Sequence, residues 1–348
     1  MTDDRSDEPA TDGHSSADGG PGSVTIAYIA RSAGVSIPTV SKVINGRAGV
    51  SAQTRARIEE LIEQYGYRRP TGNRNNIVEL VFRELASMWA VEIIRGVERV
   101  ARKNRVGVMV SEFGLHDSAG MSIEDTVGRR PQCVLSVAQL STAERDQLTA
   151  RGIPFVVFDP TEELPDDVPF VGATNWRGGH MATRHLTGLG HRRIAMINGP
   201  DHPFCRARLA GYRSALAEAG LPADSALVVR GPLTREGGQA AARELLSRPD
   251  RPTAIFTAND LQALGVYLAA RELGLAIPRD LSVVGFDDLP VVAWVDPPLT
   301  TVHQPLYEMA AAATELAMSL GRGEEMTQVG LEIATTLTVR ESTAPPAS

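Results

Sequence analysis

The sequence predicts an α/β protein in which a small, helical, basic head precedes a much larger body. Three observations lead to this fold class. Basic residues gather near the N-terminus, short helical patterns occupy the same region, and strand-like and helix-like segments alternate along the rest of the chain. With 348 residues, of which 43% are hydrophobic, the chain is long enough for two or three packed domains.

Charge is distributed unevenly along the chain. Residues 1–23 contain one arginine and six acidic residues among glycine, serine and threonine, so this segment is predicted to be disordered. Residues 24–76 contain eight basic and three acidic residues, although the whole chain has a net charge of −7. A basic module joined to an acidic body is typical of a phosphate-binding domain fused to a domain with another task.

The composition predicts a cytoplasmic protein with no membrane partner. The chain has no continuous apolar run of the roughly 18 residues that a membrane span needs, and it begins with a polar, acidic segment instead of a signal peptide. Cys133 and Cys205 lie far apart, one in an apolar strand-like run and one at the start of a helix. No disulfide framework is therefore predicted.

Three short helices are predicted in the head. Thr25 is placed as the N-cap of the first helix and Gly34 ends it, while Ser36 caps the second helix and Ser51 caps the third. The turn between the first two helices is short and contains glycine. This is the helix-turn-helix arrangement, which lays its second helix in the major groove of DNA.

The outward side of the second helix carries the residues that can reach base edges. Lys42 can donate to guanine O6 and N7, Asn45 to phosphate or adenine, and Ile37 can contact a thymine methyl group. The residues predicted to contact DNA are Thr25, Ser36, Ile37, Pro38, Thr39, Ser41, Lys42, Asn45, Arg68 and Arg69. The alternative interpretation is a solvated helix face in an unrelated three-helix module.

The sequence of the body predicts strands that alternate with helices. Helical patterns cover residues 89–103, 174–188, 205–219, 235–247, 259–273 and 305–320, and apolar runs such as "PFVVFD", "TAIFTA" and "SVVGFDD" separate them. Such alternation predicts parallel sheets with helices on both faces, and the length of the body predicts two subdomains. Ligands of such folds bind beyond the carboxyl ends of the strands.

Polar side chains at these strand ends indicate a ligand pocket. Asp159 ends "PFVVFD", Asn259 follows "AIFTA", Asp287 ends "SVVGFD", and Arg208 lies at the start of the helix after "RIAMINGP". Carboxylates, an amide and a guanidinium fork suit the recognition of vicinal hydroxyls. The pattern therefore favours a small carbohydrate.

Neighbouring candidates have structural interpretations. Asp260 and Asp288 are interpreted as helix caps rather than ligand contacts. His180, His185 and His191 lie near one another in sequence, but none is paired with a cysteine or carboxylate at metal-ligand spacing, so no metal is predicted. The chain also lacks the G-x-x-x-x-G-K, G-x-S-x-G and H-E-x-x-H patterns, and it has no G-x-G-x-x-G after a strand. Neither a cofactor nor an enzymatic activity is predicted.

Several longer motifs carry a family resemblance. "VTIAYIARSAGVSIPTVSKVINGRAGVSAQTRARIEELIEQYGY" resembles the DNA-binding head of the lactose-repressor (LacI/GalR) family of bacterial transcription regulators. "GATNWRGGHMATRHLTGLGHRRIAMINGP", "RARLAGYRSAL", "TAIFTANDLQALG", "IPRDLSVVGFDDLP" and "PPLTTVHQP" extend the resemblance over almost all of residues 24–342. It implies a two-lobed body like that of periplasmic sugar-binding proteins, with a chain that crosses between the lobes three times.

Domain boundaries follow from the pattern and the resemblance together. The predicted segments are an acidic disordered tail at 1–23, a helix-turn-helix domain at 24–67, a short linker at 68–76, an effector-binding and dimerisation domain at 77–342, and a disordered tail at 343–348. Within the body, lobe 1 is placed at 77–172 and 305–325, and lobe 2 at 173–304 and 326–342.

The resemblance also implies partners and effector-binding residues. The positions that match are Trp89, Ser136, Asp159, Arg208, Leu233, Asn259, Asp287 and Gln304. Relatives contact sugars or nucleobases through the positions of Arg208, Asn259, Asp287 and Gln304, and the other four flank or line the pocket. The implied assembly is a homodimer on a near-palindromic double-stranded DNA operator.

The linker departs from the family pattern. Relatives have a longer linker with an A-R-x-L-like hinge helix, whereas residues 68–76 contain no such motif and include a proline and a glycine, which disfavour a helix. Arg68, Arg69 and Arg74 are expected instead to run along phosphates or into the minor groove.

The sequence thus predicts a transcriptional repressor of carbohydrate-utilisation genes that a small sugar releases. One alternative is a sugar-binding module or transport receptor without regulatory DNA binding, against which the basic head argues. A second alternative is a repressor that responds to a purine-like corepressor. A pocket rich in acids and poor in aromatic residues argues for a sugar over a purine.

Overall fold

The structure is a computed structural model that describes residues 26–44, 49–65, 74–83, 85, 88–113, 122–324 and 328–347. The chain divides into two compact units, Met1–Asn73 and Arg74–Ser348. Several predictions fall outside the described residues: the acidic tail at 1–23, the DNA contacts of Thr25, Asn45, Arg68 and Arg69, and the side chain of Ser41.

The head packs three short helices around a small apolar core. These helices are α1 (Ile26–Ala33), α2 (Ile37–Ile44) and α3 (Ala52–Gln64). Ile29, Val40 and Ile58, one from each helix, are fully buried. Gly34 ends α1 with a φ of 67°, a left-handed conformation that glycine adopts without steric cost. Ser51 caps α3, as predicted, because its side chain accepts a hydrogen bond of 3.2 Å from a backbone N–H of the first turn.

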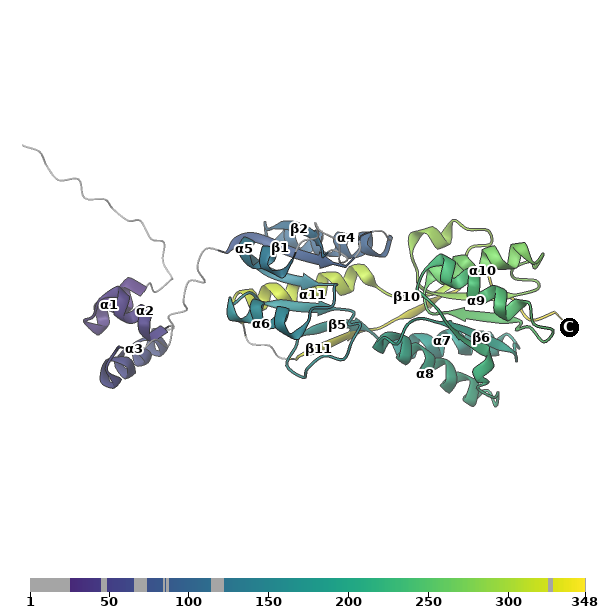
Figure 1. Ribbon diagram of the computed structural model, residues 1–348, viewed down its shortest axis with the longest axis horizontal. Coiled ribbons are helices and arrows are strands. Elements are labelled where there is room, and N and C mark those ends of the chain that lie inside the picture. The colour runs from purple at the N-terminus through teal and green to yellow at the C-terminus, as the bar shows by residue number, and fades with distance from the viewer. Residues whose placement is uncertain are drawn as a thin grey trace, which may run out of the picture. The chain divides into compact units, whose positions relative to one another are not determined.

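Lobe 1 of the body is a six-stranded parallel sheet between two layers of helices (Figure 1). Its strand order is β11-β5-β4-β3-β1-β2. The strands are β1 (Asn75–Phe82), β2 (Gly107–Glu112), β3 (Pro131–Ser136), β4 (Phe155–Phe158), β5 (Phe170–Ala173) and β11 (Gly330–Ile333). The helices are α4 (Met88–Lys103), α5 (Ile123–Arg129), α6 (Thr142–Ala150) and α11 (Leu306–Gly321).

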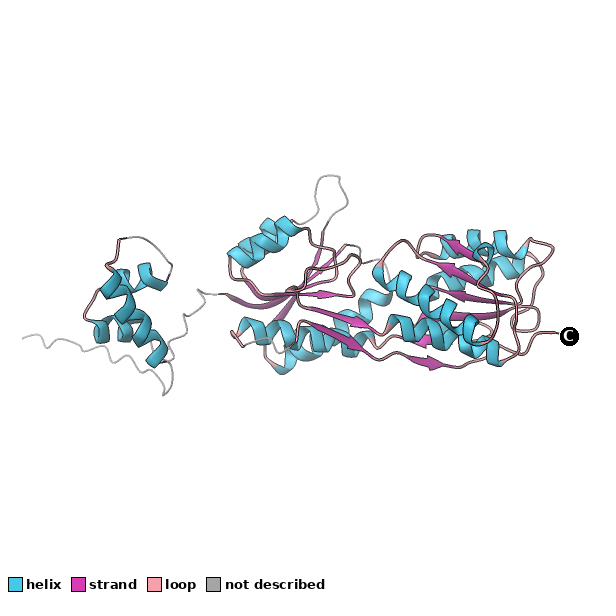
Figure 2. Ribbon diagram, turned by 90° about the horizontal axis from the view of Figure 1, so that it is seen from below, coloured by secondary structure: helices cyan, strands magenta, loops and turns pink. Residues whose placement is uncertain are grey.

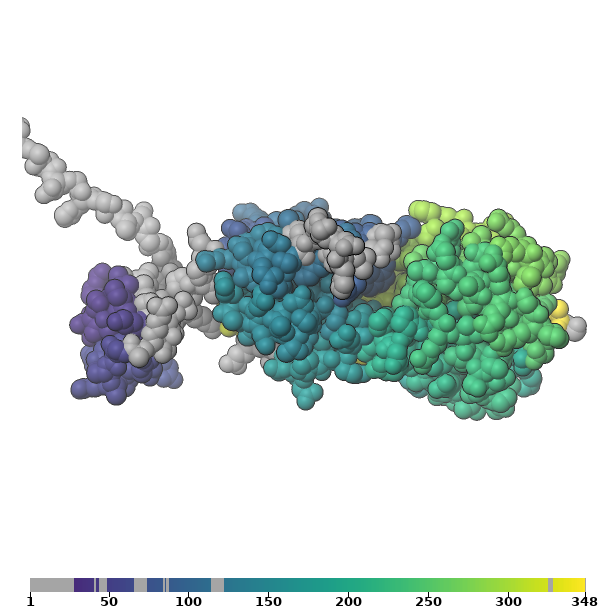
Figure 3. All heavy atoms as spheres, viewed as in Figure 1, coloured from purple at the N-terminus to yellow at the C-terminus, as the bar shows by residue number. Residues whose placement is uncertain are grey.

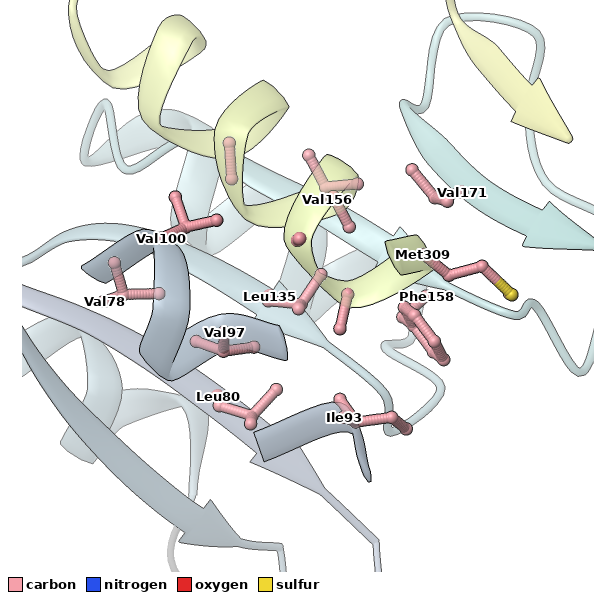
Figure 4. Close-up of a cluster of buried hydrophobic side chains, with 14 of the residues drawn as sticks. Val78, Leu80, Ile93, Val97, Val100, Leu135, Val156, Phe158, Val171 and Met309 are labelled. Carbon is pink, nitrogen blue, oxygen red and sulfur yellow. The ribbon is translucent and has the colours of Figure 1, made fainter. Parts of the chain in front are cut away.

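The core of lobe 1 lies under α4 and α11. Leu80 of β1, Val97 of α4 and Met309 of α11 are fully buried and belong to one apolar cluster (Figure 4). A second cluster, on the opposite face of the sheet, joins the strands to α5 and α6. Helices on both faces leave only the ends of the strands for a ligand, which is where parallel sheets bind one.

Lobe 2 repeats this layered arrangement (Figure 2). Its strands are β6 (Ile194–Asn198), β7 (Val228–Arg230), β8 (Ala254–Thr257), β9 (Ser282–Asp287), β10 (Thr300–His303) and β12 (Thr336–Thr338). Its helices are α7 (Asn175–Gly188), α8 (Pro203–Glu218), α9 (Arg235–Leu246) and α10 (Asp260–Glu272), with short 3-10 turns at Ser225–Leu227 and Pro290–Ala293. The strand order is β12-β10-β9-β8-β6-β7, and only β12 runs antiparallel to its neighbour.

The chain crosses between the lobes three times: from β5 to α7, from β10 to α11, and from β11 to β12. In the space-filling view the surface is hollowed between the two lobes (Figure 3). Thr174 and Thr335 lie on the first and third crossings, and their hydroxyl oxygens are 3.1 Å apart. The backbone N–H of Thr335 also donates to the Thr174 hydroxyl at 3.0 Å. These two crossings are therefore bonded to each other.

Two boundary predictions at the start and end of lobe 1 are wrong. β11 pairs in parallel with β5, so it belongs to lobe 1 and not to a second-lobe segment at 326–342. β1 begins at Asn75, inside the predicted linker at 68–76. Arg74 does not extend toward phosphates, because its guanidinium donates to the carbonyls of Gln132 at 3.3 Å, Gly321 at 3.0 Å and Gly152.

The predicted disordered tail at 343–348 is wrong for its first two residues. The Ala344 N–H donates to the Ser282 hydroxyl at 3.0 Å, and the Thr343 hydroxyl lies 2.9 Å from His185 Nε2. The tail is held because it runs beside β9, where the Val283 N–H donates to the Ser342 carbonyl at 2.9 Å. Within the residues that the structure describes, no helix is long and apolar enough to cross a membrane.

Candidate functional site

The exposed side of α2 is the candidate DNA-reading surface. Ile37 is 47% exposed, and Pro38 and Lys42 are exposed as well, while the opposite side of the helix lies in the core of the head. Ser36 and Thr39 mark the beginning of the helix with hydroxyl oxygens 2.9 Å apart. α2 can thus present a charged donor and an apolar side chain together to a major groove.

Lys42→Ala should weaken binding to the operator by about 1–3 kcal/mol and relax base preference at one position of each half-site, if Lys42 contacts a base. An anisotropy titration would compare random DNA with an operator selected by the protein from a random pool. Arg57→Ala, on the exposed surface of α3, is the matched control. Equal losses on operator and random DNA would reduce Lys42 to a phosphate contact.

The candidate effector site lies in the body, at the carboxyl ends of strands from both lobes. Asp159 follows β4 in lobe 1, and Asp287 is the last residue of β9 in lobe 2. Gln304 follows β10 on the second crossing, and Arg208 lies in the second turn of α8. All four side chains are buried. The structure therefore gathers four of the predicted residues into one buried polar cluster.

Arg208 is the centre of this cluster and is only 2% exposed. Its Nε donates to Asn175 Oδ1 at 2.9 Å, one terminal nitrogen donates to the Ala258 carbonyl, and the other donates to Gln304 Oε1 at 3.4 Å. Its guanidinium carbon lies 3.5 Å from the ring centroid of Phe286, in cation–π contact. Each terminal nitrogen keeps one further N–H for a ligand. Arg208 is therefore a buried member of the cluster and not a partner in a surface ion pair.

Gln304 connects Arg208 to lobe 1. While its Oε1 accepts from Arg208, its Nε2 donates to Asp159 Oδ2 at 3.1 Å. Because Gln304 lies on a crossing, this chain of hydrogen bonds joins lobe 1, the crossing and lobe 2. These hydrogen bonds place polar groups of both lobes within one connected set.

Burial perturbs the two carboxyls of the cluster. It raises the pKa of Asp159, against the opposing charge of Arg208 and the hydrogen bond from Gln304. Burial also raises the pKa of Asp287 well above its ordinary value. The positive charge of Arg208 lowers this pKa, and the negative charge of Asp260 raises it further. The backbone is strained at the same place, with φ of 47° at Asp159 and 117° at Asp287. Strain of this kind gathers at functional sites.

The Asn259 side chain is hydrogen-bonded both to the Leu233 carbonyl and to the first turn of α10. Asn259 is the N-cap of α10, and its Oδ1 accepts from the Gln262 N–H at 2.9 Å. Its Nδ2 donates to the Leu233 carbonyl at 3.0 Å. Asn259 therefore offers a ligand one remaining N–H and one remaining oxygen lone pair.

Trp89 and Ser136 lie on lobe 1, outside the hydrogen bonds of the cluster. Trp89 is half-buried in the first turn of α4, and its ring meets Phe158 edge-on with centroids 5.8 Å apart. Phe158 precedes Asp159, so the indole lies near the cluster while packing on the lobe core. Ser136 is fully buried, and its hydroxyl donates to the Ala138 carbonyl at 2.7 Å.

The interpretation of Asp260 and Asp288 as helix caps is wrong, although both have structural partners. Asn259, not Asp260, caps α10. Asp260 is fully buried and accepts from the Thr301 hydroxyl at 2.6 Å and the Leu289 N–H at 2.8 Å. Asp288 pairs with Arg340 at 2.7 Å and His303 at 3.2 Å. These carboxylates fix the loop that follows Asp287, the last residue of β9.

The pair of His303 and Asp288 predicts a dependence on pH. The Asp288 carboxylate, 3.2 Å from His303 Nδ1, raises the pKa of His303 above its ordinary value, against burial. The pair therefore stabilises the body fully below the ordinary histidine pKa of about 6.5 and loses this effect as pH rises through the folded value. In His303→Gln the fall in thermal midpoint between pH 6 and pH 8 should be smaller than in the wild type. Identical falls in both proteins would contradict this.

The three clustered histidines have protein partners. His180 lies 2.8 Å from Glu218, His185 bonds the Thr343 hydroxyl, and His191 Nε2 lies 3.0 Å from the Ser282 hydroxyl. Burial lowers the pKa of His185 and of His191. Among the described residues no group of histidine, cysteine or carboxylate side chains could hold a metal ion.

Sequence reasoning missed two residues that position Arg208. Asn175 is the first residue of α7, and its Nδ2 donates to the Ala173 carbonyl at 3.0 Å while its Oδ1 receives the Arg208 Nε–H. Phe286 lies under the guanidinium. The position of Asn175, two residues after the end of β5 and at a helix start, is the signal that could have nominated it, as the same position relative to β8 nominated Asn259.

A helix-turn-helix head and a two-lobed body with a buried polar cluster between its strand ends define the class of ligand-responsive DNA-binding regulators. Residues 25–70 match the family described as bacterial regulatory proteins, lacI family, and residues 183–343 match a periplasmic binding protein-like domain. The chain belongs to the lacI family of bacterial regulatory proteins.

Similar proteins cover nearly the whole chain. Catabolite control protein A of Priestia megaterium is 30% identical over 330 residues, which are 92% of this chain and 99% of that protein. The cellobiose complex of the transcriptional regulator CelR has a TM-score of 0.70 at 34% identity and covers 92% of this chain and 99% of its own. The lac repressor dimer bound to operator has a TM-score of 0.67 at 25% identity and covers 93% and 100%.

Proposed function

We propose that the protein represses carbohydrate-utilisation genes by binding a near-palindromic operator as a homodimer, and that a small sugar releases it. One observation carries the proposal: the buried side chains of Asp159, Arg208, Asp287 and Gln304 gather between two lobes of a chain that also carries an exposed helix-turn-helix surface, and Gln304 bonds both Arg208 and Asp159. In this proposal the protein acts in the cytoplasm, by binding alone, and catalyses no reaction.

The chemistry of the cluster supports a sugar effector. Asp159 and Asp287 can accept from hydroxyls, and Arg208 can donate two N–H groups to neighbouring oxygens, which matches a vicinal diol. A purine would need an aromatic face to stack on, but Arg208 already lies over Phe286 and the Trp89 ring contacts Phe158. The similarity to CelR, whose structure contains cellobiose, makes cellobiose the first sugar to try.

A thermal-shift screen tests the sugar assignment. Wild-type protein and Asp287→Ala would be heated with cellobiose, other disaccharides, monosaccharides and purine bases. Binding to the folded state raises the midpoint in proportion to the logarithm of ligand concentration. A midpoint raised by a sugar in the wild type but not in Asp287→Ala supports the proposal, and a midpoint raised only by a purine favours the corepressor alternative.

The crossings offer the route from sugar to DNA. A ligand shifts an equilibrium between body conformations only by its differential affinity for them. Gln304 and Asn175 lie on or beside crossings and both bond Arg208, so a sugar that rearranges Arg208 changes the segments that join the lobes. We infer that the lobe movement changes the spacing of the two heads, with a coupling in the lower part of the usual range of about 1–3 kcal/mol.

A dimer is required for two heads to read two half-sites on successive turns of DNA. The lac repressor was solved as a dimer on its operator. Trp294, after the 3-10 turn at Pro290–Ala293, is 75% exposed, and a second copy of the body would bury such an indole. We expect the full chain to sediment as a dimer at micromolar concentration and Trp294→Ser to weaken the dimer. A wild-type monomer at that concentration would contradict the expectation.

The chief alternative is a sugar-binding module or transport receptor that makes no regulatory DNA contact. Lys42 and the rest of the exposed α2 surface would then have no ligand. Selection of DNA from a random pool separates the two functions. Enrichment of a palindromic sequence supports the repressor, and a pool that stays random supports the sugar-binding module.

A further inference from the structure

The body of the chain begins with a side chain that is held at three points. The guanidinium of Arg74 donates to the Gly321 carbonyl at 3.0 Å, to the Gln132 carbonyl at 3.3 Å and to the Gly152 carbonyl. Gly321 is the last residue of α11, and Gly152 lies two residues beyond the end of α6. Carbonyls at the end of a helix lack intrahelical partners and carry partial negative charge, so a guanidinium fork suits them.

The next two side chains are held in the same way. Asn75 Nδ2 donates to the Arg129 carbonyl at 2.6 Å, and Asn76 Nδ2 donates to the Arg105 carbonyl at 2.8 Å. Arg129 is the last residue of α5, and Arg105 lies two residues beyond the end of α4. Three consecutive side chains, residues 74–76, thus bond carbonyls at the C-terminal ends of the four described helices of lobe 1. We call these three residues the anchor.

Backbone pairing alone holds this segment only in part. The Asn75 N–H donates to the Arg130 carbonyl at 2.8 Å, but β1 pairs with β2 only from Ile77 onward. The register of β1 with β3 shifts between Asn75 and Val78. Val78 is fully buried in the core of lobe 1, so the core begins after the anchor. The side chains of the anchor therefore extend the fixed part of the chain toward the head.

The anchor lies where the chain enters the body. Residues 66–73 separate Tyr65, the last described residue of the head, from Arg74. The anchor is at the amino end of β1, whereas the buried polar cluster lies beyond the carboxyl ends of the strands. Substitutions in the anchor should therefore spare the candidate sugar site. What they change is the length of chain that is free between the head and the body.

We propose that the anchor sets the spacing of operator half-sites that the dimer accepts, because it fixes the length of the connection between each head and the body. The inference rests on the proposed function, since only a dimer on two half-sites has a spacing to select. Releasing three residues lengthens each connection by up to about 10 Å. One added base pair moves a half-site by about 3.4 Å along the DNA and about 34° around it. The lengthened connection can follow such a move.

Operators with altered spacing test the anchor. The starting operator is the sequence that the wild type selects from a random DNA pool, and one or two base pairs are added to or removed from its centre. The full-length wild type should bind the selected spacing at least about tenfold more tightly than a spacing changed by one base pair. In Arg74→Ala/Asn75→Ala/Asn76→Ala this ratio should fall to about threefold or less, while the affinity for a single half-site stays near that of the wild type.

Arg151→Ala is the matched control. Arg151 is exposed and precedes Gly152, so the change removes the same positive charge next to the anchor but none of the hydrogen bonds of the anchor. It should keep the wild-type ratio, and an equal fall in this variant would trace the effect to charge and overturn the inference. A partly unfolded protein binds all operators more weakly by the same factor, so the ratio reports the connection and not the stability of the fold.

A second variant covers the case in which the triple variant does not fold. Arg74→Ala/Asn75→Ala keeps the bond of Asn76 to the end of α4, and its ratio should lie between those of the wild type and the triple variant. An unchanged ratio in a variant that binds the selected operator, or a wild type that binds every spacing alike, would overturn this inference alone. A DNA pool that stays random would instead overturn the proposed DNA-binding function, and the inference with it.

Discussion

Arg208→Ala should abolish the response of operator binding to sugar while leaving the sugar-free operator affinity near that of the wild type. Arg208 is 2% exposed and bonds Asn175, Ala258 and Gln304, so it holds the first and second crossings together. The change removes the donors for a sugar and also the link that transmits its binding. The expected loss is the whole coupling free energy of about 1–3 kcal/mol, which is a factor of roughly 5 to 150 in operator affinity.

The measurement is an operator titration with and without the sugar found in the thermal screen. Arg213→Ala, an exposed position on the same helix, is the matched control and should keep a full response. Arg208→Lys keeps the charge but not the planar fork, so it should bind sugar poorly. If Arg208→Ala retains a normal shift in operator affinity, Arg208 is not part of the effector site.

The folding of Arg208→Ala must be checked separately, because Arg208 also stabilises the charged forms of two buried carboxyl groups. Its charge lowers the pKa of Asp159 and of Asp287, which burial raises. Without it both pKa values rise further above the unfolded values, so the variant should be least stable, relative to the wild type, at high pH. Sugar titrations near pH 6 therefore separate a lost contact from a lost fold.

The sequence predicts local features of the head because they depend on neighbouring residues. A short polar side chain before an apolar stripe identifies the Ser51 cap, and a glycine after the last buried residue identifies the end of α1 at Gly34. The long helices of the body are predicted to within two residues at either end for the same reason. α4, predicted at 89–103, runs from Met88 to Lys103, and α10, predicted at 259–273, runs from Asp260 to Glu272.

Long-range pairing is what the sequence could not provide. β11 is four residues long with alternating exposure, and nothing in it specifies pairing with β5 rather than with lobe 2. Ala344 is held by hydrogen bonds to Ser282, 62 positions away, and to His191. Arg74 lies in a basic stretch that suggests phosphate, but carbonyls from three distant segments hold it.

The candidate site shows the same division between position and pairing. The positions of strand ends and helix starts nominated Asp159, Arg208 and Asp287, the family resemblance added Gln304, and the structure gathers all four. The sequence analysis assigned the helix cap to Asp260, but Asn259 caps α10 and Asp260 bonds the loop after β9. Both follow the same strand, and only the folded neighbours decide which groups they reach.

Gly179→Ala should destabilise the body and displace Arg208. α7 and α8 approach so closely that a Cβ at Gly179 would stand 2.9 Å from the Arg208 Cα and closer still to its carbonyl oxygen. Backbone atoms cannot move aside as a flexible side chain can, so α8 must shift. Alanine gains up to about 1 kcal/mol over glycine in a helix, but overpacking costs typically 1–3 kcal/mol, and here it acts on two backbones. We expect a net loss of about 2 kcal/mol.

Gly188→Ala is the matched control, because Gly188 ends the same helix and has no atom within 4 Å of the added Cβ. It should be neutral or stabilising in a denaturant titration of the body, whereas the Gly179→Ala midpoint should fall. Because the shift of α8 carries Arg208 away from Asn175, Gly179→Ala should also lose sugar affinity under conditions where it is still folded. A Gly179→Ala protein with the midpoint and sugar affinity of the wild type would mean that the close approach of α7 and α8 does not position Arg208.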